Sequence, residues 1–169
     1  MKLLKNPELR KKIFFSLGVI VIFRLLAHIP VPGVNTLAIK AYLSSNALFS
    51  IFDLFSGGGF QNFSIATLGV GPYINASIII QLLTMMIPAL EELQKEGDTG
   101  REKINMYTKF LTIPMGLVQS FGIYFLLSRQ GIMVGLKTFE VITLILTLMA
   151  GSFLLVWLGD LVTEKGIGN

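Results

Sequence analysis

The sequence lacks cysteine altogether, and it contains a single histidine, His28. The absence of cysteine excludes disulfide bonds and thiol catalysis, and one histidine cannot supply the three or four ligands of a usual zinc site. No nucleophile and base occur as a pair at helical spacing, as an enzyme active site would require. We therefore expect no cofactor, no metal site and no enzymatic activity.

Charged residues are also scarce. They make up 14% of the 169 residues, whereas soluble globular domains contain about 25%. Hydrophobic residues make up 53% and the mean hydropathy is +0.71, which indicates a membrane protein. No charged residue occurs between Asp53 and Glu91, and this interval is longer than the about 20 residues of helix that cross a bilayer. The long interval therefore predicts a broken span rather than a straight one.

Four apolar segments predict an all-α fold, a polytopic membrane helix bundle in a single domain over residues 1–169. Before the first segment, "NPELRKK" is typical of a helix start, with Asn6 able to cap and Pro7 at the first helical position. We expect an interfacial helix there, with a frayed basic tail as the alternative. The expected segments are an interfacial stretch at 1–12, spans at 13–29, 72–87, 106–128 and 139–159, and a solvated cytoplasmic loop at 88–104.

Lysine and arginine residues flank the spans unevenly. Ten of them lie in the N-terminal tail, in the 91–109 segment and at the C-terminal end, against Lys40, Arg129 and Lys137 on the opposite side. Cytoplasmic loops carry the excess of positive charge in membrane proteins. Both ends of the chain and the 88–104 loop are therefore expected in the cytoplasm.

The second span contains helix breakers at Gly69, Gly71 and Pro72. Irregular backbone at membrane depth survives only where protein buries it or where it lines a watery cavity. We therefore expect a short half-helix at 51–67 that dips into the membrane, a break, and a longer helix at 72–87. Broken helices of this kind line the pathways of channels and transporters.

Polar and apolar residues form two stripes on the 72–87 helix. Ser77, Gln81 and Thr84 follow i, i+4, i+7 spacing with Asn75 beside them, and the apolar stripe on another face consists of Val70, Ile74 and Ile78. On spacing alone, interhelical hydrogen bonding is the better interpretation of the polar stripe. Packing is likewise the commoner role for the apolar residues.

Two further pairs of charged or titratable residues lie at i and i+4. Arg24 and His28 share a face of the first span, where a proton relay is one interpretation and snorkelling of Arg24 towards the interface is the preferred one. Asp160 and Glu164 follow the last span. A charged helix end is the better interpretation of that pair, rather than a catalytic or metal site.

Four phrases carry a specific resemblance: "FRLLAHIPVPGVN", "FDLFSGGGFQNFSIATLGVGPYINASIIIQLL", "KEGDTGREKINMYTKF" and "WLGDLVTEKGIGN". In this order and spacing the chain resembles the N-terminal part of the SecY family, the channel subunits of the bacterial Sec translocon. The resemblance implies a half of a clamshell that encloses an hourglass pore and opens sideways into lipid. Its expected function is to move signal-bearing polypeptides across the cytoplasmic membrane and to release transmembrane segments laterally.

The resemblance also implies roles for particular residues. Two belong to the apolar pore ring, Val70 and Ile74. Four belong to the lateral gate, Asn75, Ile78, Gln81 and Thr84. The 51–67 segment would be the plug helix, with Phe52, Phe55, Gly57, Gly58, Phe60, Phe63 and Ile65 as its plug residues.

The partners that the resemblance implies are the remaining C-terminal half of the channel, the SecE and SecG subunits, the SecA motor, the ribosome, signal sequences and nascent chains, and the lipid bilayer. No direct nucleic-acid binding is expected. Four spans do not complete a pore, so the chain is expected to be inactive on its own. The alternative is a self-standing four-helix protein that forms a homodimeric pore or transporter for small solutes.

Overall fold

The computed structural model is mainly α-helical in the part of the chain that it describes, which comprises residues 7–32, 34–44, 51, 53–54, 56–133 and 135–167. The β-structure in these ranges is one isolated antiparallel bridge between Pro30 and Ser64. The named helices are α1 (Pro7–Leu26), α2 (Thr36–Ser44), α4 (Gly71–Met86), α5 (Pro88–Lys95), α6 (Asp98–Arg129) and α7 (Thr138–Lys165). The predicted all-α membrane bundle is therefore confirmed.

Two of these helices, α6 and α7, are long and apolar enough to cross a membrane. A third candidate is the pair α4 and α5, which passes the same test together but is bent by 103°. Helix α1 is 20 residues long, yet Arg10, Lys11 and Lys12 occupy its first two turns. The count of four spans stays a prediction.

The N-terminal part of the chain is simpler than expected. A separate interfacial helix is absent between residues 7 and 26, because Pro7 starts one continuous helix, α1, that includes the first apolar run. The helix ends at Leu26, where His28 N donates to Leu25 O over a tighter turn. After it, Asn35 Oδ1 accepts hydrogen bonds from the amides that open α2, a helix that the sequence analysis does not assign.

The predicted solvated loop at 88–104 is instead a helical corner. Pro88 occupies the first turn of α5, and Glu91 and Lys95 form an i, i+4 ion pair at 2.6 Å on it, which favours a helix. Gly97, with φ +78°, then reverses the chain so that α6 starts at Asp98. The expected third span at 106–128 is therefore the later part of a 32-residue helix.

Small residues let the helices approach closely. Helix α6 packs against α4 and α7, and α1 packs against α7. The buried face of α6 includes four small residues at intervals of four, Thr108, Thr112, Gly116 and Ser120. Their hydroxyl groups donate to carbonyl groups one turn earlier in α6, so burial leaves none of them unsatisfied. Small side chains at such intervals are typical of close packing between membrane helices.

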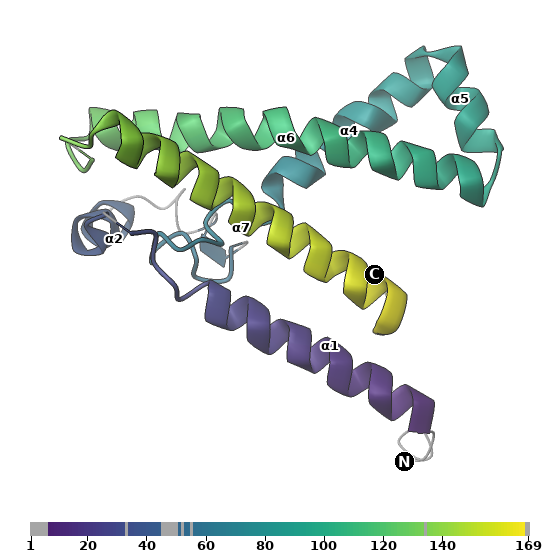
Figure 1. Ribbon diagram of the computed structural model, residues 1–169, viewed down its shortest axis with the longest axis horizontal. Coiled ribbons are helices and arrows are strands. Elements are labelled where there is room, and N and C mark those ends of the chain that lie inside the picture. Colours follow the sequence, from purple (N-terminus) through teal and green to yellow (C-terminus); the bar gives the residue numbers. More distant parts are fainter. Residues whose placement is uncertain are drawn as a thin grey trace.

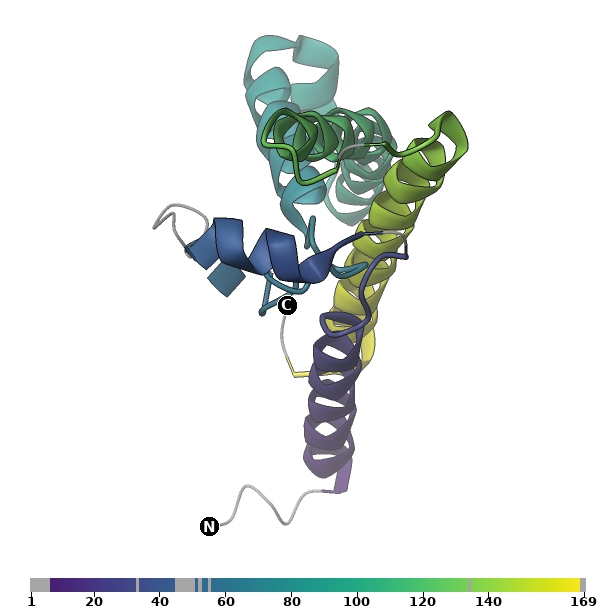
Figure 2. The same cartoon turned by 90° about the vertical axis from the view of Figure 1, so that its left-hand side faces the viewer.

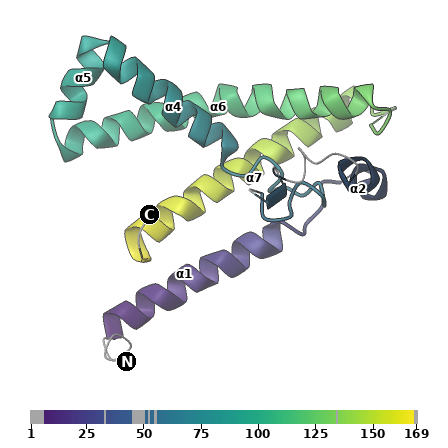
Figure 3. The ribbon, with the colours of Figure 1, turned by 180° about the vertical axis from the view of Figure 1, so that it is seen from behind.

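The helices extend between two ends of the molecule. The start of α1, the corner between α5 and α6, and the end of α7 lie towards one end, and the turn between α6 and α7 lies with α2 towards the other (Figures 1 and 3). Figure 2 shows α2 lying crosswise to α1 and α7. Helix α4 begins midway between the two ends (Figure 1), so its N-terminus lies inside the depth of the bundle.

The helical corner can be tested with two glycine substitutions on α6. A Cβ atom at Gly100 would lie 1.6 Å from the Leu93 carbonyl oxygen, whereas a Cβ atom at Gly122 would meet nothing within 4 Å. We expect Gly100→Ala to lower the free energy of unfolding by about 1–3 kcal/mol, because backbone has to move. Gly122→Ala should be neutral, or should stabilise by up to about 1 kcal/mol. Denaturant titration of both variants in detergent measures the difference, and equal stabilities would contradict the corner.

Candidate functional site

The break in the second span is a left-handed turn followed at once by a helix start. Gly69 has φ +56°, a conformation that glycine adopts without steric cost. Val70 caps α4, and Pro72 lies in its first turn, where a missing amide hydrogen is harmless. The amides of Gly69 and Gly71 donate to Ala66 O and Leu68 O. Both glycine amides of the break therefore keep a backbone partner, as a membrane interior favours.

The expected half-helix at 51–67 is wrong for its larger part. Residues 56–70 form turns, and helical conformation in the described part of the segment is confined to residues 51 and 53–54. Gly57, Gly58 and Phe63 have φ values of +62°, +85° and +42°, and left-handed residues interrupt a right-handed helix. Two of the expected plug residues, Phe52 and Phe55, lie outside the described residues. We refer to the described turns that precede the break as the 56–68 loop.

Polar side chains replace the missing helical hydrogen bonds of this loop. Ser56 Oγ accepts a hydrogen bond from Phe60 N at 2.9 Å, and Asp53 Oδ1 accepts one from Gln61 N at 2.9 Å. Thr67 Oγ1 donates to Gly59 O at 3.1 Å. A loop that satisfies its own backbone can be buried at low cost.

The second part of the loop is enclosed between α1 and α7. Phe63 and Ser64 are fully buried, and a short antiparallel bridge joins this stretch to the chain that follows α1, with Val31 N donating to Phe63 O at 2.9 Å and Ile65 N donating to Ile29 O at 3.0 Å. On the other side, Gly151 of α7 approaches so closely that a Cβ atom there would lie 1.8 Å from Ile65 O. Sequence reasoning missed Gly151, whose only signal is a small residue within the apolar run of α7.

The remaining plug predictions fall on buried and half-buried positions. Phe60 and Phe63 belong to the hydrophobic core with Leu68, Leu127 and Leu148, and Ile65 packs against that core. These side chains fill the interior beside α6 and α7. They therefore fix the loop within the bundle.

The predicted pore-ring residues lie on an exposed stripe of α4. Val70 and Ile74 are 41% and 49% exposed, and Ile78, a predicted lateral-gate residue on the same stripe, is 50% exposed. The opposite face of α4 is buried along Pro72, Ala76, Ile80 and Thr84, and α6 packs against α4. Inside the described bundle, then, the aliphatic stripe is left without a helix to cover it.

Gln81 lies on the same exposed stripe and not on a separate face. It is seven residues from Ile74, which corresponds to about two turns of α-helix, and both side chains are exposed. Gln81 Nε2 donates to Ser77 Oγ at 3.3 Å. The expectation of separate polar and apolar faces is therefore wrong for this residue.

Thr84 and Asn75 are placed differently from Gln81. Thr84 is 4% exposed, and its hydroxyl group donates to Ile80 O in the same helix at 2.5 Å. Asn75 is exposed. The structure thus brings Ser77 and Gln81 together and separates Thr84 from them.

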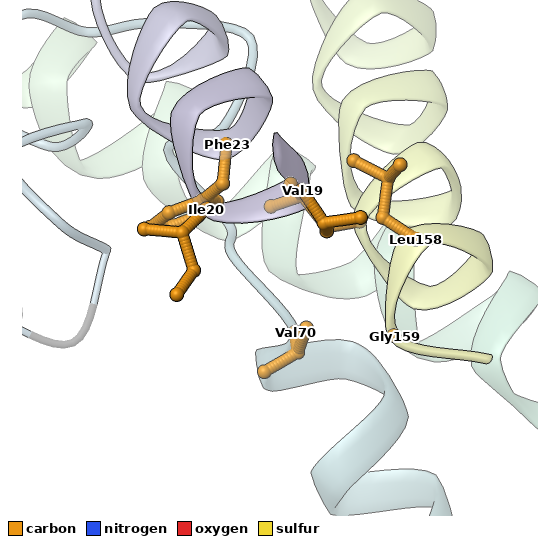
Figure 4. A pocket seen from close by; sticks show the side chains of 7 residues that line it. Val19, Ile20, Phe23, Val70, Leu158 and Gly159 are labelled. Carbon is orange, nitrogen blue, oxygen red and sulfur yellow. The ribbon is translucent and has the colours of Figure 1, made fainter. Parts of the chain in front are cut away.

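An apolar groove of about 210 Å³ opens beside Val70. Helix α1 contributes Val19, Ile20 and Phe23, and α7 contributes Leu155, Leu158 and Gly159. Figure 4 shows Val70 at the start of α4, facing the gap between these two helices. Sequence reasoning missed the α1 and α7 residues, because their apolar side chains look like ordinary lipid-facing positions.

Three of the four charged or titratable residues singled out in the sequence, Arg24, His28 and Asp160, have hydrogen-bond partners in the structure. Arg24 Nη1 donates to Gly57 O at 2.5 Å, and His28 Nδ1 lies 2.8 Å from Arg24 O. The preferred interpretation of Arg24 as a snorkelling residue therefore gives way to a specific contact with the 56–68 loop. Lys109 Nζ donates to Asp160 Oδ2 at 2.7 Å and ties α6 to α7.

Comparison with known proteins gives a consistent result. The SecY family model matches residues 64–169. The chain is 43% identical to protein translocase subunit SecY of Corynebacterium glutamicum over 98% of its length, and 46% identical to that of Aquifex aeolicus over 99%. The Borreliella burgdorferi protein of the same name is 43% identical over the whole chain. The chain spans 40–41% of the length of these curated relatives.

The two glycines of the break should respond differently to alanine. Gly69 has a positive φ, whereas Gly71 starts a helix, where a Cβ atom would make an ordinary contact 3.5 Å from Gln119 Oε1. We expect Gly69→Ala to cost about 1–2 kcal/mol of stability. Gly71→Ala should cost nothing or stabilise slightly. Unfolding of both variants in detergent checks this, and an equal loss in both would show that backbone conformation at Gly69 is not the cause.

Proposed function

This chain belongs to the SecY family, and from that membership we propose that it forms the N-terminal part of a protein-conducting channel in the cytoplasmic membrane. The channel would move signal-bearing polypeptides across the membrane and release transmembrane segments sideways into lipid. Because the chain spans 40–41% of its relatives' length, we assign this activity to the chain together with the sequence that completes the channel.

The observation that carries the proposal is the start of α4 at the middle of the bundle. Val70, Ile74 and Ile78 project from it on a stripe that the described helices leave exposed, and Val70 borders the apolar groove between α1 and α7. A helix that begins inside the membrane next to an irregular loop is typical of a transport pathway. This arrangement supports a pore ring that includes Val70 and Ile74.

Branched aliphatic side chains suit a seal around a moving polypeptide. They make no lasting polar contacts with the chain that passes, and a narrow apolar constriction resists ions by dewetting. The 56–68 loop would fill the funnel next to this ring as a plug. Its many internal hydrogen bonds support a compact plug rather than the helix that the sequence predicts.

The lateral gate would use the exposed stripe of α4. Ile78, Gln81 and Asn75 are exposed and are available to a facing half of the channel, whereas the buried Thr84 would support α4 from behind. A signal helix that binds the parted gate better than the closed one opens it by that difference in affinity alone.

The proposed topology has both ends of the chain and α5 on the cytoplasmic side. This follows from the ten lysine and arginine residues in the N-terminal tail, in the 91–109 segment and at the C-terminal end. The start of α1, the corner between α5 and α6 and the end of α7 lie towards one end of the molecule, which supports it (Figure 1). The proposed partners are the C-terminal half of the channel, SecE and SecG, the SecA motor and the ribosome, with signal sequences and nascent chains as substrates.

Complementation tests this function. The chain is co-expressed with a complementary C-terminal half of a SecY channel in cells depleted of their own channel, and export of a signal-bearing reporter is followed. We expect export to be restored only when both halves are present. Failure with both halves inserted and stable would contradict the proposal, and solute flux through a homodimer of this chain would then favour the alternative.

The pore-ring assignment predicts the effect of Ile74→Gly in the complemented channel. Removing a 49% exposed aliphatic side chain from the constriction should raise ion leak through the resting channel severalfold. Leu82→Gly is the matched control, because Leu82 is a 55% exposed residue of the same helix and glycine costs each variant about 1 kcal/mol in helix propensity. Planar-bilayer conductance measures the leak, and equal leak in both variants would refute the assignment.

A further inference from the structure

Arg24 of the first helix hydrogen-bonds the glycine turn of the 56–68 loop. Arg24 Nη1 donates to the carbonyl oxygen of Gly57 at 2.5 Å. Beside this bond, the Phe23 ring lies so close that a Cβ atom at Gly57 would be 2.7 Å from Cε1. Arg24 and Phe23 are neighbours near the end of α1, so one edge of α1 both touches and hydrogen-bonds the glycine turn at residues 56–58.

The glycine turn and the rest of the loop are held by different means. The amides of Gly57 and Gly58 donate to Leu54 O and Asp53 O, which belong to the same segment of chain. The later residues are held by segments outside the loop. Val31 N donates to Phe63 O and Ile65 N donates to Ile29 O, and Gly151 of α7 lies against the Ile65 carbonyl. Arg24 gives the turn a hydrogen bond from a side chain of α1, whereas Ala66 in the later part of the loop meets α1 through apolar packing.

The bond has a physical reason to be strong. In a helix that the sequence predicts to span the membrane, a guanidinium group is costly unless a polar partner meets it. The positive φ values of Gly57 and Gly58 turn the backbone so that the Gly57 carbonyl faces Arg24. A hydrogen bond with a charged donor is about twice as strong as one between neutral groups.

We propose that Arg24 is a positioning residue that latches the glycine turn of the loop to α1 and that the turn opens separately from the later, buried part of the loop. The proposal rests on the proposed function in so far as the loop acts as the channel plug. The latch itself is a property of this chain and is measurable without transport.

The absence of native cysteine gives a clean background for the test. Ser56 is 4% exposed in the glycine turn, and Ser64 is fully buried in the later part of the loop. Ser56→Cys and Ser64→Cys are made separately in the full chain, which is reconstituted in lipid vesicles. The rate of labelling by a water-soluble maleimide then reports how often each position opens.

Three substitutions are compared with each reporter. Arg24→Gln removes the charge, and Arg24→Lys keeps a cationic donor for the Gly57 carbonyl. Arg129→Gln is the matched control, because Arg129 lies over the Phe125 ring 4.8 Å from its centroid at the end of α6.

We expect Arg24→Gln to raise labelling at Ser56→Cys by about tenfold, given the usual strength of a charge-assisted bond. Labelling at Ser64→Cys should stay within about twofold, Arg24→Lys should restore most of the protection, and Arg129→Gln should have no effect.

Hydrogen exchange on the cysteine-free chain provides a second measurement. In the Arg24→Gln variant the amides of Gly57 and Gly58 should exchange about tenfold faster, while those of Val31 and Ile65 should keep their rates. Unchanged labelling and exchange at the turn would overturn the latch. An equal rise at Ser56 and Ser64, with loss of helical circular dichroism, would also overturn it, because Arg24 would then support the whole fold.

Export in the complemented channel separates the latch from the proposed function. A turn that opens in the Arg24→Gln variant, in a chain that fails to restore export, would confirm the latch and contradict the channel assignment. Restored export with unchanged labelling and exchange at the turn would contradict the latch and support the channel assignment.

Discussion

The hydrogen-bonding requirement of backbone inside a membrane governs this structure. Helices satisfy this requirement through their own backbone hydrogen bonds. The 56–68 loop has no such regular pattern, and the loop lies between helices whose apolar composition indicates a membrane. The loop meets the requirement with serine, threonine and aspartate side chains and with the bridge to residues 29–31. Irregular backbone of this kind is stable in a membrane only when it is enclosed by protein, so the positions of α1 and α7 follow from the need to enclose it.

Close approach of backbones is the second consequence of that enclosure. Because Gly151 has no side chain, the Ile65 carbonyl can lie against the backbone of α7. At Gly116 of α6, a Cβ atom would lie 3.6 Å from Met149 Cγ of α7. Small residues on α6 allow α4 and α7 to pack on the same helix. The buried side of α4 is thereby used for packing, and the stripe through Val70, Ile74 and Gln81 is left exposed.

Much of the fold could be predicted from the sequence, and the errors have definite causes. The break at residues 69–72 can be predicted from residue type alone. Glycine allows positive φ values, and proline fixes φ and lacks an amide hydrogen, wherever they occur in a chain. The half-helix at 51–67 was wrong because three left-handed residues override its apolar pattern. The 88–104 loop was wrong because charge and two glycines suggested solvent, whereas Pro88 and the pair Glu91 and Lys95 favour helix. The prediction of two separate faces on α4 is wrong for Gln81, because the angle of this residue around the helix places it on the stripe of Val70 and Ile74 despite its polarity.

The sequence by itself determined that this is a membrane protein, where its apolar helices lie, where the second span breaks and which family it resembles. These properties depend on residue type and on order along the chain, which hydropathy and backbone restrictions read directly. Tertiary structure alone decided that Arg24 meets Gly57, that Gly151 receives the Ile65 carbonyl and that Thr84 is buried while Gln81 is exposed. Such contacts join residues distant in sequence or depend on which face of a helix a neighbour covers, and local pattern carries no information about either.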